Sequence, residues 1–196
     1  MNFKKNIKHE ELMELPIIAY SGKVVIIDSE ESYKKIIPDI LNEKIWGFDT
    51  ETKPCFIKGK GRQPVALLQL TNSKVTYLFR LNKYGLQKEV ISLLSDPKSL
   101  KIGVSVSDDV IGLQKLKKFK PGGFIELQET VKKHNIEDMS LRKITAIVLG
   151  GRISKAQQLS NWAARKLREN QIKYAATDSW VGREIYLKLN ENIKKN

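Results

Sequence analysis

Cysteine and histidine are scarce in this chain, and their scarcity argues against two kinds of site. Among the 196 residues only Cys55 is a cysteine, so no disulfide can form within the chain. The two histidines, His9 and His134, lie far apart in the sequence and offer no Cys/His cluster for zinc. We therefore expect neither a disulfide-stapled domain nor a zinc site, and a lone thiol suits the cytoplasm.

Long apolar runs are also missing. The longest aliphatic stretches span about four residues, as at Val24–Ile27, which is far too short to cross a membrane. The N-terminus, Met1–Lys5, is not followed by the apolar region of a secretory signal. A composition of 41% hydrophobic and 29% charged residues is typical of a globular domain. We expect a cytoplasmic protein without membrane contact.

Acidic residues are absent from one long segment and nearly absent from another. Thr52–Lys88 holds 8 basic residues and no acidic one, while Arg142–Lys173 holds 8 basic residues against Glu169 alone. The net charge is +13, although the first 51 residues carry −3. Basic segments of this kind attract polyanions, so the charge pattern favours nucleic acid as the partner. The alternative is a generally basic protein whose lysines only keep it soluble.

Apolar runs and turn signals predict strands that alternate with helices. Strands are expected at 23–27, 45–51, 65–70, 75–81, 101–104 and 124–127. Helices are expected at 10–15, 30–41, 86–94, 108–118, 141–149 and 169–192, with a short helical piece starting at 161. The three strands between 45 and 81 should form an antiparallel meander. The pattern predicts a mixed α/β sheet flanked by helices, with residues 1–22 as a lead-in and 23–196 as one domain.

One short predicted strand, Ile45–Glu51, ends in two carboxylates. Asp49 and Glu51 project from one face of this strand, while Thr50 projects from the other. Two carboxylates on one face repel each other unless a cation lies between them, and a divalent ion is the usual one. The alternative is a pair of solvated residues in a turn after the strand.

Two other acidic positions have both an ordinary and a chemical interpretation. Asp108 and Asp109 open a predicted helix, for which Ser107 or Asp108 would be the N-cap. Capping accounts for one of these aspartates but does not require both. Tyr174 and Asp178 are four residues apart in the last predicted helix, so they share one face. A pair at this spacing often forms only a surface hydrogen bond.

Taken in order, three motifs resemble those of the DEDDy-type 3′–5′ exonucleases. The motifs are Phe48–Glu51 at the end of a strand, Gly103–Asp109 from strand to helix, and Tyr174–Asp178 on the last helix. The flanking segments resemble the exonuclease domain of the Werner-syndrome helicase, in a group that also includes ribonuclease D; they are Val65–Leu70, Tyr77–Leu81 and Leu159–Trp162. The resemblance implies the ribonuclease-H-like exonuclease fold.

Residue by residue, the resemblance implies a metal site of four carboxylates: Asp49, Glu51, Asp109 and Asp178. Asp109 is preferred to Asp108 because the family's second aspartate lies six residues after a glycine, here Gly103. Hard oxygen ligands suit Mg²⁺ or Mn²⁺, and the family implies two such ions. Tyr174 matches the tyrosine that positions the attacking water.

The resemblance also implies the substrate and the reaction. It implies removal of nucleoside 5′-monophosphates from single-stranded 3′ ends, with DNA favoured over RNA because the Werner type looks closest. Two alternatives stay open, an RNA-trimming enzyme of the ribonuclease D type and a nucleic-acid-binding module without catalysis. A helicase partner on a separate chain is compatible with the resemblance.

Candidate contacts to the nucleic acid lie beside the motifs. They are Thr50, Lys53, Arg62, Arg152 and Lys155. The four basic residues stand in the acid-poor segments, where they could reach phosphates. The alternative for the loop 52–62 is a mobile surface segment that contacts nothing. Trp162 could stack on a base, although packing of the last helix is the favoured interpretation.

Overall fold

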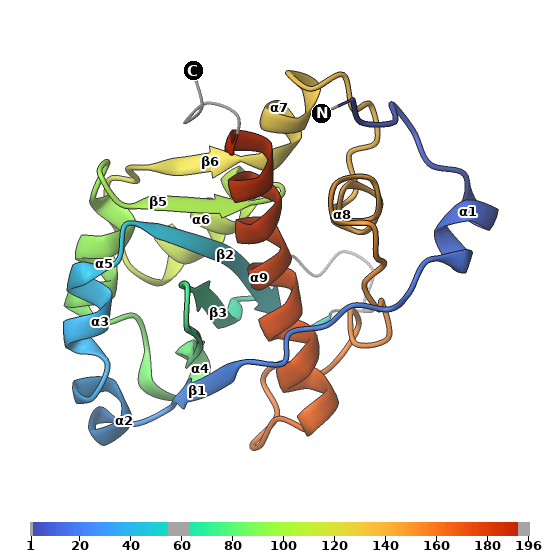
Figure 1. The fold of residues 1–196 in the computed structure, drawn as a ribbon. Helices are drawn as coiled ribbons and strands as arrows, with labels where there is room; N and C mark the ends of the chain where they lie inside the picture. The colour runs from blue at the N-terminus through green and yellow to red at the C-terminus, as the bar shows by residue number, and fades with distance from the viewer. Residues whose placement is uncertain (1, 55–62, 192–196) are drawn as a thin grey trace.

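A six-stranded mixed sheet forms the centre of the molecule (Figure 1). The computed structural model describes residues 2–54 and 63–191. The strands are β1 (Lys23–Ile27), β2 (Ile45–Thr52), β3 (Val65–Thr71), β4 (Val75–Arg80), β5 (Leu100–Gly103) and β6 (Phe124–Glu126). Their order across the sheet is β1-β4-β3-β2-β5-β6. The mixed α/β architecture expected from the sequence is confirmed.

The strands β2, β3 and β4 form the predicted antiparallel meander. β1 pairs in parallel with β4, β5 with β2, and β6 with β5. β2 pairs with β5 only over residues 45–47, whereas its pairing with β3 continues through Thr52. The residues of β2 after Gly47 therefore extend beyond β5. They have no strand partner on that side, so a helix can approach them there.

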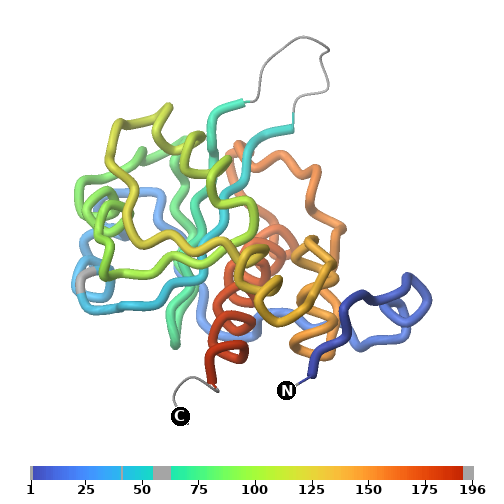
Figure 2. Tube along the Cα trace, turned by 90° about the horizontal axis from the view of Figure 1, so that it is seen from above, coloured from blue at the N-terminus to red at the C-terminus, as the bar shows by residue number. Residues whose placement is uncertain are grey.

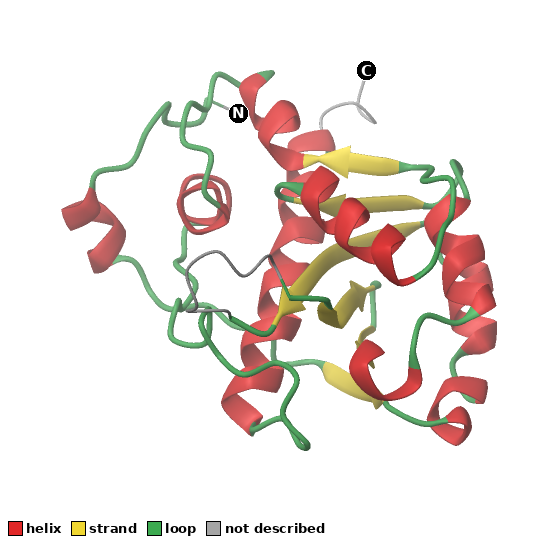
Figure 3. Ribbon diagram, turned by 180° about the vertical axis from the view of Figure 1, so that it is seen from behind, coloured by secondary structure: helices red, strands yellow, loops and turns green. Residues whose placement is uncertain are grey.

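Helices cover both faces of this sheet. They are α1 (His9–Glu14), α2 (Glu30–Lys34), α3 (Ile37–Asn42), α4 (Leu81–Tyr84), α5 (Lys88–Ser95), α6 (Val106–Leu116), α7 (Leu127–Lys132), α8 (Leu141–Leu149) and α9 (Glu169–Asn190). The long helix α9 crosses one face of the sheet in Figure 1, and α6 covers the other face in Figure 3. No helix among the described residues is both long and apolar enough to cross a membrane.

The alternation of side chains along β2 decides which helix each residue meets. Trp46 and Phe48 are buried in an apolar cluster that also contains side chains of α3, α5 and α6. Gly47 faces α9 so closely that a Cβ atom there would lie 1.8 Å from the carbonyl oxygen of Ser179. Only a residue without a side chain permits this approach of helix and strand. Asp49, two residues further on, points to the same face as Gly47.

Buried hydroxyl groups fix α9 against the sheet. The Oγ1 atom of Thr71 on β3 lies 2.9 Å from Oγ1 of Thr76 on β4 and 2.6 Å from Oγ of Ser179 on α9. All three side chains are fully buried. Hydrogen bonds of this kind satisfy polar atoms that water cannot reach. They also fix the residue that follows Asp178.

Two expected helices differ from the observed structure. The helix expected over 30–41 is divided into α2 and α3, because Pro38 occupies the first turn of α3. The segment from 161 forms turns, since the carbonyl groups of Ala163 and Ala164 accept hydrogen bonds from side chains of Asn82 and Arg80. Two short helices, α4 and α7, are not predicted from the sequence.

The start of α6 also differs from the prediction. The helix begins at Val106, and its N-cap is Ser105 in a left-handed conformation (φ 58°), in place of Ser107 or Asp108. The physical reason is a long-range contact: the Val106 backbone N–H donates to the carboxylate of Glu126 at 3.0 Å. A side chain from the end of β6 thus performs the capping that local residues were expected to provide.

The N-terminal segment packs against the second half of the chain (Figure 2). The backbone N–H of Ile7 donates to Asp138 at 2.8 Å, and Ile7 packs with Leu12 and Ala146 of α8. Further along, the Tyr20 N–H donates to Oγ1 of Thr177 on α9 at 3.0 Å. Residues before β1 therefore reach the helix that carries Asp178.

Candidate active site

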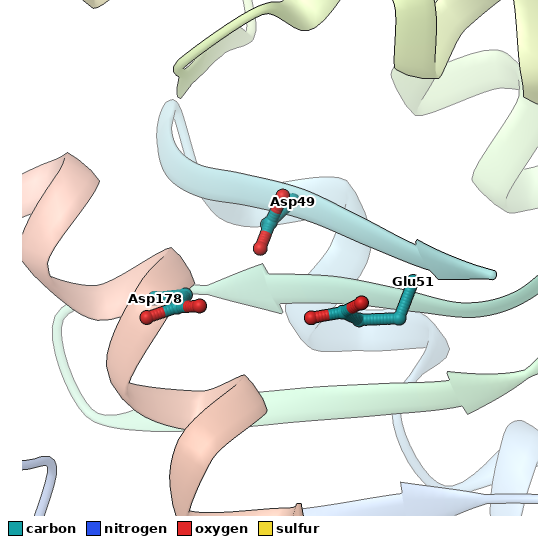
Figure 4. Close-up of side chains that lie close together, drawn as sticks. All are labelled: Asp49, Glu51 and Asp178. Carbon is teal, nitrogen blue, oxygen red and sulfur yellow. The ribbon is translucent and has the colours of Figure 1, made fainter. Parts of the chain in front are cut away.

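Three carboxylates from two elements lie close together (Figure 4). Asp49 and Glu51 come from β2, and Asp178 comes from α9. One carboxylate oxygen of each lies within 4.8 Å of the others. Asp49 and Glu51 are strand residues facing a helix, so the alternative of a solvated turn after the strand does not apply.

Asp109 approaches the same place from the other face of the sheet. It stands in the first turn of α6 and is only 6% exposed, whereas Asp108 beside it is exposed. The Thr50 hydroxyl donates to Asp109 Oδ1 at 2.6 Å. Asp109 is not in the cluster of three defined above, but its charge is among those that raise the pKa of Asp49 and Glu51.

Burial and mutual repulsion hold protons on these carboxylates. Burial is the largest cause that raises the pKa of Asp49 well above its usual range, followed by the charges of Asp109 and Glu51. The pKa of Glu51 is raised to about 9 by burial and then by the charges of Asp178 and Asp109. Burial also raises the pKa of Asp178 to about 7, partly offset by a hydrogen bond from Tyr174.

This donor set fits a hard divalent cation. Clustered carboxylates with raised pKa values gain most from a positive ion, because it removes both the repulsion and the cost of burying charge. All the clustered ligand atoms are oxygens, which Mg²⁺ and Mn²⁺ prefer.

Tyr174 faces this cluster from one turn earlier on α9. Its hydroxyl is hydrogen-bonded to Asp178, and burial followed by the charge of Asp178 raises its pKa above the ordinary value. The centroid of its ring lies 5.9 Å from that of the Trp162 ring, and the two ring planes are inclined at 39°. Trp162 is fully buried, so it packs against α9, as favoured, and cannot stack on a base in this conformation.

The predicted nucleic-acid contacts are distributed unevenly around the site. Lys53, just after β2, and Lys155, on the loop after α8, are exposed. Arg62 lies outside the described residues. Arg152 is half-buried, and its Nε donates to the Leu15 carbonyl oxygen at 3.1 Å. In this structure, its guanidinium group therefore holds the N-terminal segment.

A pocket of about 270 Å³ opens beside Tyr174 and Asp178. Three segments line it: residues 17–19 before β1, three residues after α8 (Ser154, Ala156 and Gln157), and the face of α9 from Asn170 to Asp178. The first of these segments is fixed by reciprocal backbone bonds, from Ile18 N–H to Arg152 O and from Arg152 N–H to Pro16 O, both 2.9 Å. No sequence signal marks this segment, because its polar contacts are all made through the backbone.

One buried side chain beside the cluster is not among the site residues predicted from the sequence. Gln69 on β3 stands directly opposite Asp49 and is fully buried. The signal available in the sequence was a single amide within the apolar run Val65–Leu70. Such a residue needs a partner in the core.

The comparison with protein families agrees with this geometry. A family model described as 3′-5′ exonuclease matches residues 24–194. The chain belongs to the 3′–5′ exonuclease family. It is therefore a hydrolase domain with the expected ribonuclease-H-like fold, and the resemblance to DEDDy-type exonucleases is confirmed.

Several curated relatives combine this exonuclease domain with other parts. The chain is 31% identical over 185 residues to the mouse bifunctional 3′-5′ exonuclease/ATP-dependent helicase WRN, covering 89% of this chain and 13% of the mouse protein. It is 29% identical over 184 residues to human exonuclease 3′-5′ domain-containing protein 2, covering 86% and 29%. The chain thus spans less than a third of the length of these two relatives.

Solved exonuclease structures share the fold. The Aedes aegypti Nibbler EXO domain superposes with a TM-score of 0.80 at 23% identity, covering 91% of this chain and 93% of that one. Escherichia coli RNase D gives a TM-score of 0.75 at 20% identity, covering 87% and 45%. Trypanosoma brucei RNase D in complex with RNA U12 gives 0.73 at 21% identity, covering 95% and 65%.

Proposed function

We propose that this exonuclease domain removes nucleoside 5′-monophosphates from the 3′ end of single-stranded DNA with two divalent ions, Mg²⁺ or Mn²⁺. The observation that supports the proposal is the cluster of Asp49, Glu51 and Asp178, with Asp109 beside it and Tyr174 facing it. Two bound ions would activate a water, stabilise the leaving 3′ oxygen and offset the charge of the scissile phosphate.

The four carboxylates are divided between the two ions. Asp49 clusters with Glu51 and Asp178, and the charge of Asp109 also raises its pKa, so we assign Asp49 to both ions. Glu51 and Asp178 share the α9 side and would hold the ion next to the attacking water. Asp109, which accepts a hydrogen bond from Thr50, would bind the second ion. Protons released from these groups on metal binding leave with the solvent.

Tyr174 is assigned to the attacking water. Because the pKa of Tyr174 is raised, its hydroxyl stays protonated at neutral pH and can donate or accept a hydrogen bond. It is therefore a poor base but a suitable group to orient a nucleophile. The hydrogen bond to Asp178 and the packing against Trp162 hold the ring toward the cluster.

The substrate strand would approach past exposed cations and the pocket beside α9. Lys53, two residues after Glu51, and Lys155, next to two residues that line the pocket, are exposed and suit phosphate contacts. The pocket reaches Tyr174 and Asp178 and is large enough for a nucleobase. Thr50 is buried and its hydroxyl serves Asp109, which favours a role in holding that carboxylate over a direct contact with nucleic acid.

RNA is the second candidate substrate. The preference for DNA follows the resemblance to the Werner type, and the helicase that WRN combines with its exonuclease motivates a helicase partner on a separate chain. The superposition with an RNase D solved in complex with RNA U12 supports an RNA-trimming activity instead. A module that binds without cleaving is disfavoured, because Asp49, Glu51 and Asp178 lie close together and the charge of Asp109 and the hydroxyl of Tyr174 act on them.

The direct test uses 5′-labelled single-stranded DNA, a 3′-recessed duplex and single-stranded RNA, each with Mg²⁺ or Mn²⁺. We expect a ladder of products shortened from the 3′ end, fastest on DNA, and none in EDTA. Faster shortening of RNA would support the ribonuclease D type of activity. Binding of all three without products would identify a non-catalytic module.

A neighbouring pair of aspartates supplies a matched control. Asp109→Asn should abolish turnover by removing a metal ligand, whereas Asp108→Asn, one residue away on the exposed side of α6, should retain it. Equal loss in both variants would mean that a general disturbance of α6, and not ligand chemistry, explains the effect.

A further inference from the structure

Gln69 is a buried amide placed directly against the candidate metal site. It occupies the middle of β3 among apolar residues and is fully buried. In the antiparallel pairing of β2 and β3 it is the direct partner of Asp49. Directly paired residues project from the same face of a sheet, with Cβ atoms about 5 Å apart. Gln69 therefore points to the α9 face, as Asp49 does.

Two acceptors of Asp49 determine how this amide is oriented. The Nε2 atom of Gln69 lies 3.2 Å from the backbone oxygen of Asp49 and 3.2 Å from its Oδ2 atom. The orientation follows from the hydrogen-bonding network, since the reverse would place Oε1 against both acceptors. In this orientation the amide nitrogen donates to two oxygen atoms of the same residue.

These contacts restrict the carboxylate that the mechanism needs most. The backbone contact fixes the amide relative to β2, and the contact to Oδ2 then limits rotation of the Asp49 carboxylate. A neutral donor does this without neutralising the carboxylate. Groups that hold metal ligands from behind in this way typically change metal affinity about 10–100-fold when they are removed.

We propose that Gln69 is a positioning residue, which orients the Asp49 carboxylate for the divalent ions. The proposal rests on the proposed function, in which Asp49 is a metal ligand. It assigns no chemical step to Gln69 itself. Without the amide, Asp49 remains in the site but samples orientations that do not bind both ions.

The test replaces the amide by an apolar chain of similar length. Gln69→Met removes both hydrogen bonds, and Gln69→Asn keeps an amide but shortens the chain by one methylene. We expect the affinity for Mn²⁺ to fall at least about 10-fold in both variants. Affinity is measured without nucleic acid, from the electron paramagnetic resonance signal of free Mn²⁺, and turnover is then followed against Mn²⁺ concentration.

A second buried glutamine supplies the control. Gln171 on α9 is 2% exposed; its Nε2 donates to the Asn161 carbonyl oxygen at 3.4 Å and its Oε1 accepts from the Arg168 N–H at 3.0 Å, so neither contact involves a carboxylate. Gln171→Met should lower the melting temperature but leave the Mn²⁺ affinity unchanged. Comparing the Gln69 and Gln171 variants therefore separates the general effect of losing a buried amide from the loss of the contact with Asp49.

The outcomes distinguish the positioning role of Gln69 from the proposed function of the domain. A raised Mn²⁺ requirement in the Gln69 variants, with turnover largely restored at high Mn²⁺, supports the positioning role. Wild-type Mn²⁺ affinity in both Gln69 variants, or an equal loss in Gln171→Met, overturns it while the proposed function stands. Failure of the wild-type protein to bind Mn²⁺ would overturn both.

Discussion

Replacing Gly47 by alanine should push α9 away from the sheet at the active site. The added Cβ atom would lie 1.8 Å from the carbonyl oxygen of Ser179 and 2.8 Å from its carbonyl carbon. Both of these are backbone atoms, so a change of rotamer cannot relieve the clash. Real Cβ atoms essentially never come closer than 3.0 Å, so helix and strand must separate by about 1.2 Å.

This displacement acts on both stability and catalysis. Overpacking of a core costs about 1–3 kcal/mol, and each kcal/mol lowers the melting temperature of a domain of this size by roughly 2–4 °C. Asp178 precedes Ser179, so it moves with the helix, away from Asp49 and Glu51 on β2. A misplacement of about 1 Å in an active site can lower the rate on the order of 100-fold. We expect a similar loss of turnover and a weaker affinity for Mn²⁺.

The assay combines thermal melts, Mn²⁺ titration and turnover of single-stranded DNA. Gly182→Ala on the same helix is the matched control, because its Cβ would lie 3.3 Å from the nearest atom, the Ile102 carbonyl oxygen, a tight contact that a shift of a few tenths of an ångström relieves. Alanine also favours a helix over glycine by up to about 1 kcal/mol, so this variant should be near wild type. Wild-type stability and turnover in Gly47→Ala would refute the reasoning.

Three further predictions concern the charges and the tyrosine. Tyr174→Phe should lower turnover by roughly 100-fold while Mn²⁺ affinity is retained, since only the group that orients the water is lost; loss of Mn²⁺ binding would contradict this role. In EDTA, stability should fall between about pH 5 and pH 9, because the folded site retains protons that the unfolded chain releases, with the pKa of Glu51 raised to about 9 and that of Asp178 to about 7. Melts across this pH range should lose that slope in saturating Mn²⁺, and an unchanged slope would contradict the metal site. Lys155→Ala should weaken DNA binding and reduce the slope of log affinity against log salt by about 1, whereas Lys133→Ala, at the residue that follows α7, should not.

Features encoded by neighbouring residues could be predicted from the sequence. The alternation along β2 placed Asp49 and Glu51 on one face, and the spacing of Tyr174 and Asp178 placed them on one face of α9. The end of α8 at Gly150 follows from glycine's access to the left-handed conformation seen there (φ 72°). These signals depend only on the periods of strand and helix and on local turn chemistry.

Features that depend on distant contacts could not be predicted. The start of α6 is decided by Glu126, which lies 20 residues beyond Val106 and reaches it only because β6 pairs with β5. Arg152 stands in a basic segment, yet its guanidinium group is used by the N-terminal segment. Net charge along a chain indicates what a surface attracts, but it does not show which cations the fold itself uses.

Three carboxylates of the site have the same kind of hydrogen-bonding partner, a feature that no single motif shows. Each of three receives a hydrogen bond from an uncharged donor: Thr50 to Asp109, Gln69 to Asp49, and Tyr174 to Asp178. A lysine or arginine in such a position would orient the carboxylate equally well, but its charge would compete with a divalent ion for it. A neutral donor fixes the direction of the carboxylate and leaves the negative charge to the metal. Burial, together with repulsion within the metal-free site, raises the pKa values of Asp49 and Glu51, and a bound cation would relieve both costs.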